Sequence, residues 1–192
     1  MDTTFCDLSL ALAPGVVMTP RSASENLVRE ALERIGGRAV RVADVGTGSG
    51  ALAVAIAVGA PGAEVWATDV NATAVRLAAE NAERHGVADR VHALEASLLD
   101  GVPKGLDLVL ANLPYLPERL RGQTAYDEEP WCAIYAAGDG LGHYRALLDA
   151  AEDHLAEDGA IAIQLHRRVH AADRRRLEQL RATVESYADL AA

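Results

Sequence analysis

Hydrophobic residues recur along this chain with two different spacings, which alternate from one stretch to the next. After Ser22–Glu25, which has the form of a capping box, apolar residues recur every three or four positions until the glycines at 36–37, so we predict a helix there. Shorter apolar runs predict strands near residues 40–45, 64–69, 90–95, 106–111 and 159–165, and a last short strand near 183–188. Further helices are predicted near residues 51–58, 71–85, 141–156 and 171–181.

This alternation of strands and helices predicts an α/β fold with a doubly wound, mostly parallel sheet. The length suits one domain, and we expect a single domain over residues 1–192, with an N-terminal segment and capping helix in 1–37 and a Rossmann-like core in 38–192. Ligands of such sheets bind beyond the carboxyl ends of the strands. Four polar residues at the ends of predicted strands should therefore meet at that edge: Asp44, Asp69, Ser97 and Asn112.

The turn after the first core strand is rich in glycine. Residues 44–50 read Asp-Val-Gly-Thr-Gly-Ser-Gly, and such a turn lets backbone N–H groups approach a ligand closely. Gly46-x-Gly48-x-x-Ala51 matches the loose dinucleotide fingerprint, whereas the whole segment is similar to the first motif, D-x-G-x-G-x-G, of S-adenosylmethionine methyltransferases. Asp44 favours the second interpretation, because an acid there suits the ammonium group of a methionine moiety and would repel a pyrophosphate.

Asp69 ends the second core strand, about 20 residues beyond the glycine turn, where an acid can hold ribose hydroxyls. Both classes of cofactor require such an acid, so it indicates a nucleoside without distinguishing between them. A glycine turn packed tightly for purely structural reasons is the alternative. The residues that we predict to bind the cofactor are Asp44, Gly46, Thr47, Gly48, Ser49, Gly50, Asp69, Val70, Ser97, Leu98 and Asn112.

The strand at 106–111 runs directly into Asn112-Leu113-Pro114-Tyr115. The Asn112 side-chain oxygen and the Leu113 carbonyl can offer two acceptors to the hydrogens of a planar NH2 group. Pro114 would fix the turn, and Tyr115 offers a ring face for a flat amide or base. We therefore predict that these four residues are catalytic and that an amide or amino nitrogen attacks an electrophile, which nicotinamide enzymes do not need. The alternative is an asparagine that caps the strand end through its own backbone.

Composition narrows the kinds of partner. The 192 residues carry a formal net charge of −10, which disfavours a wide nucleic-acid surface because such surfaces need clustered Lys and Arg. Cys6 and Cys132 have neither metal-ligand spacing nor the pattern of a disulfide framework, and no metal site is expected. No apolar stretch approaches the ~18 residues of a membrane span, and the N-terminus lacks a basic signal region. A cytoplasmic protein without membrane contact is the default expectation.

Three further segments carry the resemblance to a known family. Residues 20–25 read Pro-Arg-Ser-Ala-Ser-Glu, residues 129–130 read Glu-Pro, and residues 138–145 read Gly-Asp-Gly-Leu-Gly-His-Tyr-Arg. They resemble the PRPETE segment and the EPxxAL…GGxDGLxxYR block of the HemK/PrmC protein-glutamine methyltransferases, and Asn112–Tyr115 resembles the NPPY motif of that family. The second block is the most specific, because other amino-methylating families lack it. The resemblance is to the catalytic domain and covers nearly the whole chain.

This resemblance implies a Rossmann-like class I methyltransferase that uses S-adenosylmethionine as its cofactor. The implied activity is N-methylation of a glutamine side-chain amide in a protein. The implied partner is a protein substrate, a translation release factor or a ribosomal protein. An activating partner subunit is a further expectation, because short relatives commonly rely on one.

The chain departs from the family pattern at two positions and at its end. Leu113 takes the second place of the NPPY motif, but its carbonyl is still present, so both acceptors are retained. Ser97 stands where the family usually has an Asp that reaches the adenine amino group, so adenine recognition is either weaker or uses the backbone near Leu98. The chain stops where the last antiparallel strand of the family's sheet should begin, and we expect a sheet without that strand.

Two other functions remain open on the sequence. The first is an N-methyltransferase that acts on the exocyclic amino group of adenine or guanine in RNA or DNA, since the asparagine chemistry is the same; the net charge makes a nucleic-acid partner the weaker expectation. The second is a cofactor-binding partner subunit without catalysis, which Ser97 leaves open. An arginine run could contact nucleic acid, but the solvated face of a helix is favoured for it: Arg167, Arg168, Arg174, Arg175, Arg176 and Arg181.

Overall fold

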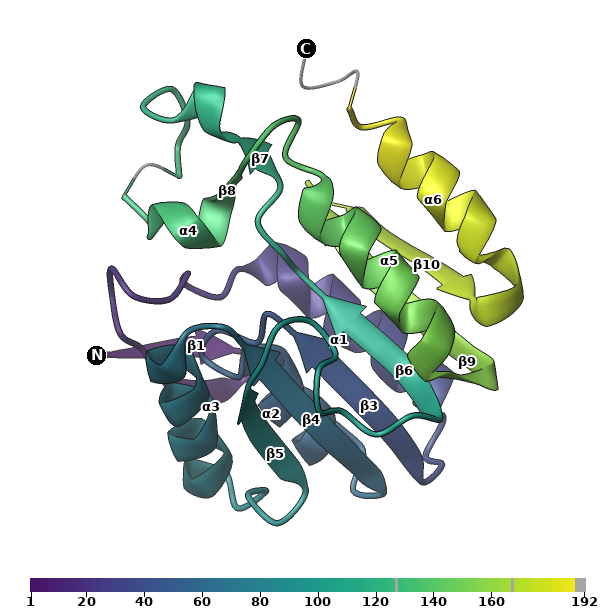
Figure 1. Cartoon of the computed structure of the whole chain (residues 1–192). Coiled ribbons are helices and arrows are strands. Elements are labelled where there is room, and N and C mark those ends of the chain that lie inside the picture. The colour runs from purple at the N-terminus through teal and green to yellow at the C-terminus, as the bar shows by residue number, and fades with distance from the viewer. Residues whose placement is uncertain (127, 167, 189–192) are drawn as a thin grey trace.

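The computed structural model describes residues 1–126, 128–166 and 168–188. Its centre is a six-stranded sheet, drawn as arrows in Figure 1, in which the edge strand β10 is antiparallel to its neighbour and the other pairs are parallel. In spatial order the strands are β10 (Arg168–Asp173), β9 (Leu155–Leu165), β6 (Leu106–Ala111), β3 (Val40–Val45), β4 (Ala63–Asp69) and β5 (Val91–Glu95).

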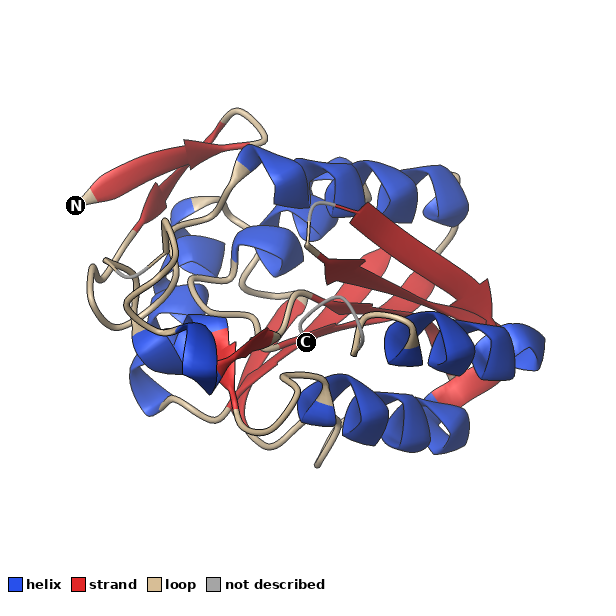
Figure 2. Cartoon of the chain, turned by 90° about the horizontal axis from the view of Figure 1, so that it is seen from above, coloured by secondary structure: helices blue, strands red, loops and turns tan. Residues whose placement is uncertain are grey.

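Helices cover both faces of this sheet, as the view in Figure 2 shows. They are α1 (Ser22–Ile35), α2 (Ala51–Gly59), α3 (Ala72–Arg84), α5 (Gly142–His154) and α6 (Leu177–Glu185). The short helix α4 (Trp131–Ile134) and the 3₁₀ turn η1 (Glu118–Leu120) lie over the carboxyl edge instead (Figure 1), and the 3₁₀ turn η2 (Arg174–Arg176) leads from β10 into α6. Side chains of α1 and α2 pack on one face, and those of α5 and α6 pack on the other. The predicted doubly wound α/β fold is confirmed. Among the described helices, none has both the length and the apolar character needed to cross a membrane.

Each central strand presents apolar side chains to both helical layers. In β6, Leu108 and Leu110 belong to the core beneath α1 and α2, whereas Val109 and Ala111 belong to the core beneath α5 and α6. Successive side chains of a strand point to opposite faces, so a strand that is covered on both sides reads as an uninterrupted apolar run. Because β3, β4, β5, β6 and β9 are parallel, their carboxyl ends share one edge of the sheet.

The C-terminal part of the chain differs from the expectation. We predicted a helix over 171–181, a strand near 183–188 and a sheet that lacks the last antiparallel strand of the family. Instead the chain turns back after β9 to form β10, an edge strand antiparallel to β9, and then continues into α6. The expected strand near 183–188 is therefore wrong, and the predicted helix begins later, at Leu177. The apolar residues there follow helical spacing and are buried on one face of α6: Leu177, Leu180 and Val184.

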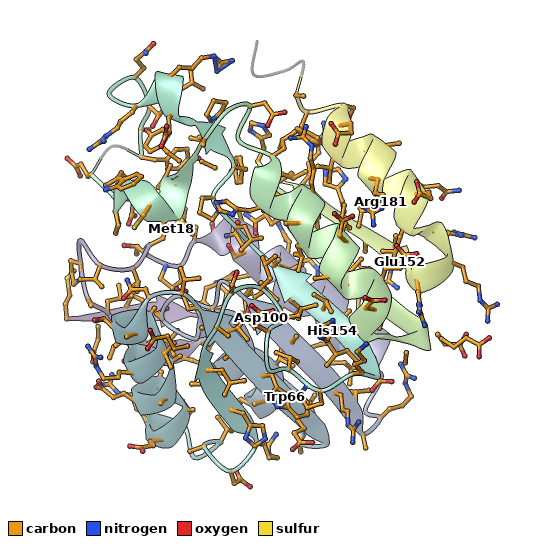
Figure 3. All side chains as sticks on the ribbon, in the orientation of Figure 1. Met18, Trp66, Asp100, Glu152, His154 and Arg181 are labelled. Carbon is orange, nitrogen blue, oxygen red and sulfur yellow. The ribbon has the colours of Figure 1, made fainter. Side chains whose placement is uncertain are left out.

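Two arginines of the predicted run form ion pairs with acidic residues of the chain. Arg181 of α6 faces α5, where its Nη2 lies 3.4 Å from Glu152 Oε2 (Figure 3). Arg175 lies 3.2 Å from the carboxylates of both Glu157 and Asp158. These arginines are thus partly neutralised by acids of the same protein. Arg167 lies outside the described residues.

An N-terminal hairpin precedes the first helix and was not predicted. Its strands β1 (Asp2–Phe5) and β2 (Leu8–Ala11) pair antiparallel through a two-residue turn at Cys6 and Asp7. Both turn residues have positive φ, 48° and 61°, which is the conformation of a tight hairpin turn. The sequence gives little sign of this turn, because such turns usually contain Gly or Asn.

The expected capping box at the start of α1 is wrong. The residue that precedes the helix is Arg21, and no side chain of the described residues caps it. The Glu25 carboxylate instead accepts a hydrogen bond from the Cys6 backbone N–H at 3.3 Å. Glu25 therefore ties the helix to the hairpin rather than to its own first turn.

The segment between β6 and α5 folds over the carboxyl edge of the sheet. It contains η1 and α4, and β7 (Leu116–Pro117) pairs in parallel with β8 (Tyr135–Ala136) (Figure 1). Glu129 accepts hydrogen bonds from the Thr19 N–H and from Arg21 Nη2, both at 3.0 Å. This residue therefore fastens the segment to the chain that enters α1.

Candidate active site

Two cavities open at the carboxyl edge of the sheet, with volumes of about 390 and 520 Å³. The first lies over the glycine turn and the ends of β4 and β5, and the second lies beside Tyr115 and β9. They have one wall in common, formed by Met18, Ser24, Asn112, Leu113, Pro114 and Ala133. The turn that follows β6 is therefore in contact with both cavities.

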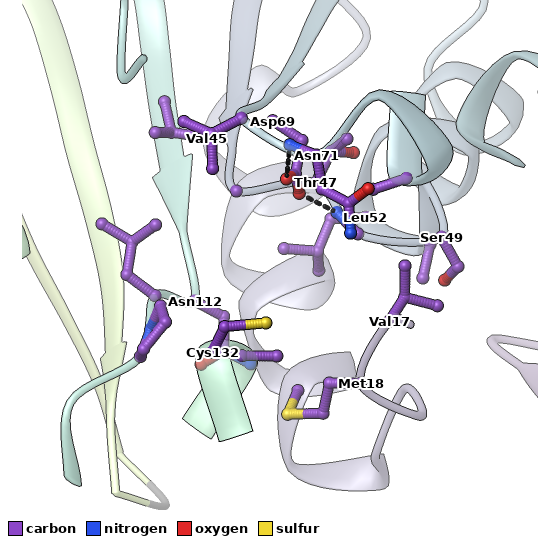
Figure 4. A pocket seen from close by; sticks show the side chains of 18 of the residues that line it. Val17, Met18, Val45, Thr47, Ser49, Leu52, Asp69, Asn71, Asn112 and Cys132 are labelled. Atoms are coloured by element: carbon purple, nitrogen blue, oxygen red, sulfur yellow. Dashed lines mark hydrogen bonds between the residues drawn. The ribbon is translucent and has the colours of Figure 1, made fainter. Parts of the chain in front are cut away.

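Most of the predicted site residues do line these cavities. The first cavity is lined by Gly46, Thr47, Gly48, Ser49, Asp69, Val70, Ser97, Leu98, Asn112, Leu113 and Pro114. Tyr115 lines the second cavity. Asp44 and Gly50 lie behind the glycine turn and line neither of the two. Figure 4 shows Thr47 and Ser49 on one side of the first cavity and Asn112 with Cys132 on the other.

The glycine turn is hydrogen-bonded to the end of β4 and packs tightly against the turn after β6. The N–H groups of Gly46 and Thr47 donate to the Thr68 carbonyl at 2.8 and 2.9 Å. A Cβ atom at Gly46 would lie 2.6 Å from Leu113 Cδ2, and Gly46 has a positive φ of 70°. A side chain at this position would therefore push against the turn that carries Asn112.

Asp44 supports the turn from below and is fully buried. Its Oδ2 accepts hydrogen bonds from the Thr47 hydroxyl at 2.6 Å and from the Ala53 N–H at 3.1 Å. Its Oδ1 is also buried and has no hydrogen-bond partner within the described part of the chain. Burial raises the pKa of Asp44 to about 6, although the bonds from Thr47 and Ala53 act in the opposite direction. The predicted contact between Asp44 and an ammonium group stays a prediction.

Asp69 lies at the end of β4, at the border of the first cavity. Its two oxygens accept hydrogen bonds from the Gly48 and Asn71 backbone N–H groups, each at 2.9 Å. Asn71 in turn caps α3 by accepting from the Thr73 N–H at 2.9 Å. The Asp69 carboxylate is thus fixed in place, while each oxygen retains acceptor capacity for a further donor.

The end of β5 supplies Ser97 and Leu98. The Ser97 side chain is exposed, and Leu98 has an unusual positive φ of 51°. The Leu98 carbonyl accepts a hydrogen bond from the Thr68 hydroxyl at 2.7 Å, which stabilises this conformation. Both residues border the first cavity, and recognition of adenine by the backbone near Leu98 stays a prediction.

Asn81 was not predicted, yet it joins α3 to the N-terminal hairpin and to the glycine turn that borders the first cavity. It is fully buried on α3, accepts from the Ala11 N–H at 2.7 Å, and donates to the carbonyls of Ala11 at 3.0 Å and Ser49 at 2.8 Å. The N-terminal hairpin is thereby fixed to the glycine turn. Residues just after the hairpin, including Val17 and Met18, then form part of the cavity wall (Figure 4).

The turn after β6 is held by two hydroxyl groups. Asn112 Nδ2 donates to the Ser24 hydroxyl at 3.2 Å, so the Asn112 amide is oriented with its oxygen as the group left for another donor. The Leu113 N–H donates to the Tyr144 hydroxyl at 3.0 Å. The sequence contained both partners within its family-like segments, but nothing in the sequence indicated that they contact this turn.

The second cavity is bordered by aromatic and polar groups. The Tyr115 and His166 rings lie 5.1 Å apart, and the Tyr115 hydroxyl donates to the His166 carbonyl at 3.3 Å. Burial lowers the pKa of His166. Gln164 also borders this cavity; it is buried, and its Oε1 has no hydrogen-bond partner in the described ranges. Among the described residues, no cluster of three His, Cys, Asp or Glu is arranged to hold a metal ion.

Comparison with known families accounts for this arrangement. Residues 19–127, more than half of the chain, match the model of a family described as the methyltransferase small domain. The chain belongs to this methyltransferase family. Membership implies S-adenosylmethionine as the methyl donor.

Relatives of this methyltransferase domain carry a more specific name. The chain is 38% identical over 164 residues to a release factor glutamine methyltransferase of Gloeobacter violaceus, and this alignment covers 83% of the chain and 57% of the relative. It is 40% identical over 153 residues to a protein of the same name from Deinococcus radiodurans, with 77% and 54% covered. The resemblance seen in the motifs is thus confirmed. The methyltransferase domain spans little more than half the length of these relatives.

Solved structures confirm the expected Rossmann-like class I fold. The methyltransferase domain is similar to a ribosomal protein L11 methylase from Lactobacillus delbrueckii subsp. bulgaricus, with a TM-score of 0.59, 26% identity, and 92% and 73% of the two chains covered. The catalytic domain of hMettl16 gives a TM-score of 0.67 with 17% identity and 93% and 66% coverage, which is a likeness of fold alone.

Proposed function

We propose that this domain methylates the side-chain amide nitrogen of a glutamine in a protein, with S-adenosylmethionine as methyl donor and a translation release factor as the favoured substrate. The observation that carries this proposal is the wall common to the two cavities. Asn112 and its neighbours contact a cavity suited to a nucleoside cofactor on one side and an open, partly aromatic cavity on the other. The names of the relatives support the same assignment.

The residues of the first cavity fit S-adenosylmethionine. Its volume of about 390 Å³ is in the range of small-molecule sites. The glycine turn would bring backbone N–H groups to the methionine part, and Asp69 would accept hydrogen bonds from the ribose hydroxyls. Asp44 lines neither cavity, and it would contribute by holding the glycine turn through its hydrogen bond with the Thr47 hydroxyl. The bound cofactor would supply a methyl group made electrophilic by a positively charged sulfur.

The residues after β6 would prepare the attacking nitrogen. An amide nitrogen is a poor nucleophile, because its lone pair is delocalised into the carbonyl. Acceptance of its two N–H hydrogens by Asn112 Oδ1 and the Leu113 carbonyl would orient the nitrogen and stabilise the positive charge that develops on it. Tyr115 would lie against the flat amide in the second cavity. Positioning and electrostatics, rather than a strong base, are therefore what this site provides.

The direct test is transfer of labelled methyl from S-adenosylmethionine to a panel of release factors, ribosomal proteins, ribosomal RNA and transfer RNA. Asn112→Ala removes the proposed acceptor. Gln179→Ala is a matched control, because it also removes a side-chain amide, whereas Gln179 is exposed on α6 and lines neither cavity. We expect label in a release factor with the unchanged protein and with Gln179→Ala, and none with Asn112→Ala.

Other outcomes would identify the alternatives. Label in RNA would assign the domain to enzymes that methylate an exocyclic amino group of a base. An absence of label with cofactor still bound, both alone and after addition of a cell extract that could supply a partner subunit, would favour a non-catalytic cofactor-binding role. Full activity of Asn112→Ala would contradict the mechanism.

A further inference from the structure

The Tyr144 side chain reaches from α5 into the core directly beneath the proposed catalytic turn. It is fully buried, and its hydroxyl accepts the Leu113 N–H at 3.0 Å. The same hydroxyl lies 2.6 Å from the Gln164 carbonyl and 3.2 Å from the Leu113 carbonyl. One phenol oxygen therefore contacts β9 and both backbone polar groups of the residue after Asn112.

A tyrosine hydroxyl has a single proton, so these contacts are not equivalent. The shorter distance assigns the proton mainly to the Gln164 carbonyl, and the Leu113 carbonyl keeps lone pairs for another donor. Burial raises the pKa of Tyr144 far above its usual range, so the hydroxyl stays protonated. The N–H and carbonyl of Leu113 belong to successive peptide groups, and contact with both restricts rotation on either side of its Cα.

A second buried hydroxyl has the matching role for Asn112. Ser24 of α1 is 4% exposed and accepts the Asn112 Nδ2 hydrogen at 3.2 Å. If the Asn112 amide were turned around, its oxygen would face Ser24 and its NH2 group would face the substrate. A hydroxyl group can accept or donate, so the Ser24 contact fixes where the Asn112 amide lies. Because the contact in the structure is with Nδ2, the Asn112 oxygen is left on the substrate side, where it can accept an N–H.

We propose that Tyr144 and Ser24 are positioning residues that hold the two acceptors of the catalytic turn in place from opposite layers of the fold. Ser24 belongs to the α1 layer, and Tyr144 belongs to the α5 layer. Neither residue needs to touch the substrate. This inference rests on the proposed function, because it concerns the acceptors for a substrate NH2 group.

The test compares Tyr144→Phe with Tyr135→Phe. Tyr135 is also buried, at 3% exposed, but its hydroxyl lies 2.6 Å from Thr124 Oγ1 in the segment after β6. For Tyr144→Phe we expect a fall of at least about tenfold in kcat, with the affinity for S-adenosylmethionine within about twofold of the unchanged protein. Tyr135→Phe should keep kcat. Normal kcat in a folded Tyr144→Phe protein would overturn the role of Tyr144.

Ser24→Ala provides a second variant that removes only a hydroxyl group, and Ser186→Ala is its control, because Ser186 is an exposed residue after α6 that lines neither cavity. Ser24→Ala should lower kcat at unchanged cofactor affinity, whereas Ser186→Ala should not. Equal kcat values in the two serine variants would contradict the role of Ser24.

Hydrogen exchange at the Leu113 amide gives a readout that does not depend on activity. Tyr144→Phe should accelerate this exchange by at least about tenfold, whereas Tyr135→Phe should leave it unchanged. Unchanged exchange in Tyr144→Phe would contradict the inferred fixation of Leu113, whichever substrate is methylated. If the unchanged protein labelled no protein at all, the proposed function would fail while the exchange result still decided whether Tyr144 holds the turn.

Discussion

The glycine turn and the Asn112 turn follow two neighbouring parallel strands, β3 and β6, yet they are held in different ways. The glycine turn is fixed by groups from one continuous stretch of the chain, residues 44–81, since Thr47 bonds to Asp44, Gly48 bonds to Asp69 and Ser49 bonds to Asn81. The Asn112 turn is fixed by distant groups. Asn112 bonds to Ser24 across 88 positions and Leu113 bonds to Tyr144 across 31.

This difference shows how the two halves of the site depend on the fold. The glycine turn takes its shape once the continuous stretch from β3 to α3 is folded. The Asn112 turn, held from α1 and α5, is correctly shaped only when both helical layers are packed on the sheet. We therefore expect damage to the glycine turn to appear in cofactor affinity, and damage to the Asn112 turn to appear in turnover.

The largest effect should come from a pair of variants that separates these two properties. Asn112→Ala should lower turnover by about 10²–10³-fold, the range found when one group that stabilises developing charge is removed, and should leave cofactor affinity nearly unchanged. Asp69→Ala should weaken cofactor binding by about 100-fold, because it frees the Gly48 and Asn71 N–H groups and removes the proposed ribose acceptor. Calorimetric titration and single-turnover rates measure the two properties. Loss of the same property in both variants would remove the distinction.

The next effect concerns the packing of the glycine turn. Gly50 has φ +79°, and a Cβ atom there would lie 2.8 Å from the Ala78 Cα of α3. Gly50→Ala should therefore lower the free energy of unfolding by about 4 kcal/mol, as backbone strain and overpacking combine. Gly86→Ala is the control, since Gly86 has φ +66° but nothing within 4 Å of the added atom, and it should cost about 1 kcal/mol. Urea unfolding measures both; equal losses would show that packing against α3 contributes nothing.

A somewhat smaller effect should appear in the pH dependence of stability. The pKa of Asp44 is raised to about 6 in the folded protein, above its ordinary value of 3.8, because the charged form is buried. Its contribution to stability is then fully present below about pH 4 and is lost as the pH rises through about 6, by up to about 3 kcal/mol. Asp44→Asn should remove this contribution to the pH dependence.

The measurement is the free energy of unfolding of the unchanged protein and of Asp44→Asn at pH 5 and pH 7.5. The difference between the two proteins isolates Asp44 from the other titrating groups. A difference that does not change with pH would mean that Asp44 titrates near its ordinary pKa. Weaker cofactor binding by Asp44→Asn at both pH values would support the predicted ammonium contact.

The comparison of the two turns also explains what the sequence could predict. The glycine turn, Asp69 and the Asn112 motif could be located because a short run of residue types at fixed spacing carries each of them. The partners Ser24, Tyr144 and Asn81 could not be assigned, because their roles arise only when distant elements pack together. The hairpin turn at Cys6–Asp7 was missed for a local reason: it contains no Gly, and Cys6 is not typical of positive φ.

The wrong prediction of the C-terminal strand also arose because contacts between distant elements decide the structure there. The segment 168–173 is short and partly polar, and it becomes a strand only because it pairs with β9. Apolar residues at 177, 180 and 184 fit a helix by spacing, but the boundary between that helix and a strand depends on where the chain leaves the sheet. Propensity alone cannot place such a boundary, since tertiary pairing overrides it.

The smallest effect should come from the surface around the two cavities. Trp131 begins α4, is 51% exposed, and lies next to Cys132 and Ala133, which line the cavities. A half-exposed tryptophan at the border of a substrate site is a typical anchor for a protein partner. Trp131→Ala should therefore raise KM for a whole protein substrate by about fivefold, or about 1 kcal/mol, without changing kcat. Trp131→Phe keeps an aromatic ring, so its KM should lie between that of the unchanged protein and that of Trp131→Ala.

A short glutamine-containing peptide makes this last prediction sharper. The peptide can fill the second cavity but is too small to reach far across the surface, so Trp131→Ala should leave its KM unchanged. An equal rise in KM for the peptide and for the whole protein would place Trp131 within the reaction site itself. A fall in kcat would go further, because it would make α4 part of the machinery that holds Asn112 and would weaken the separation between the substrate surface and the catalytic turn.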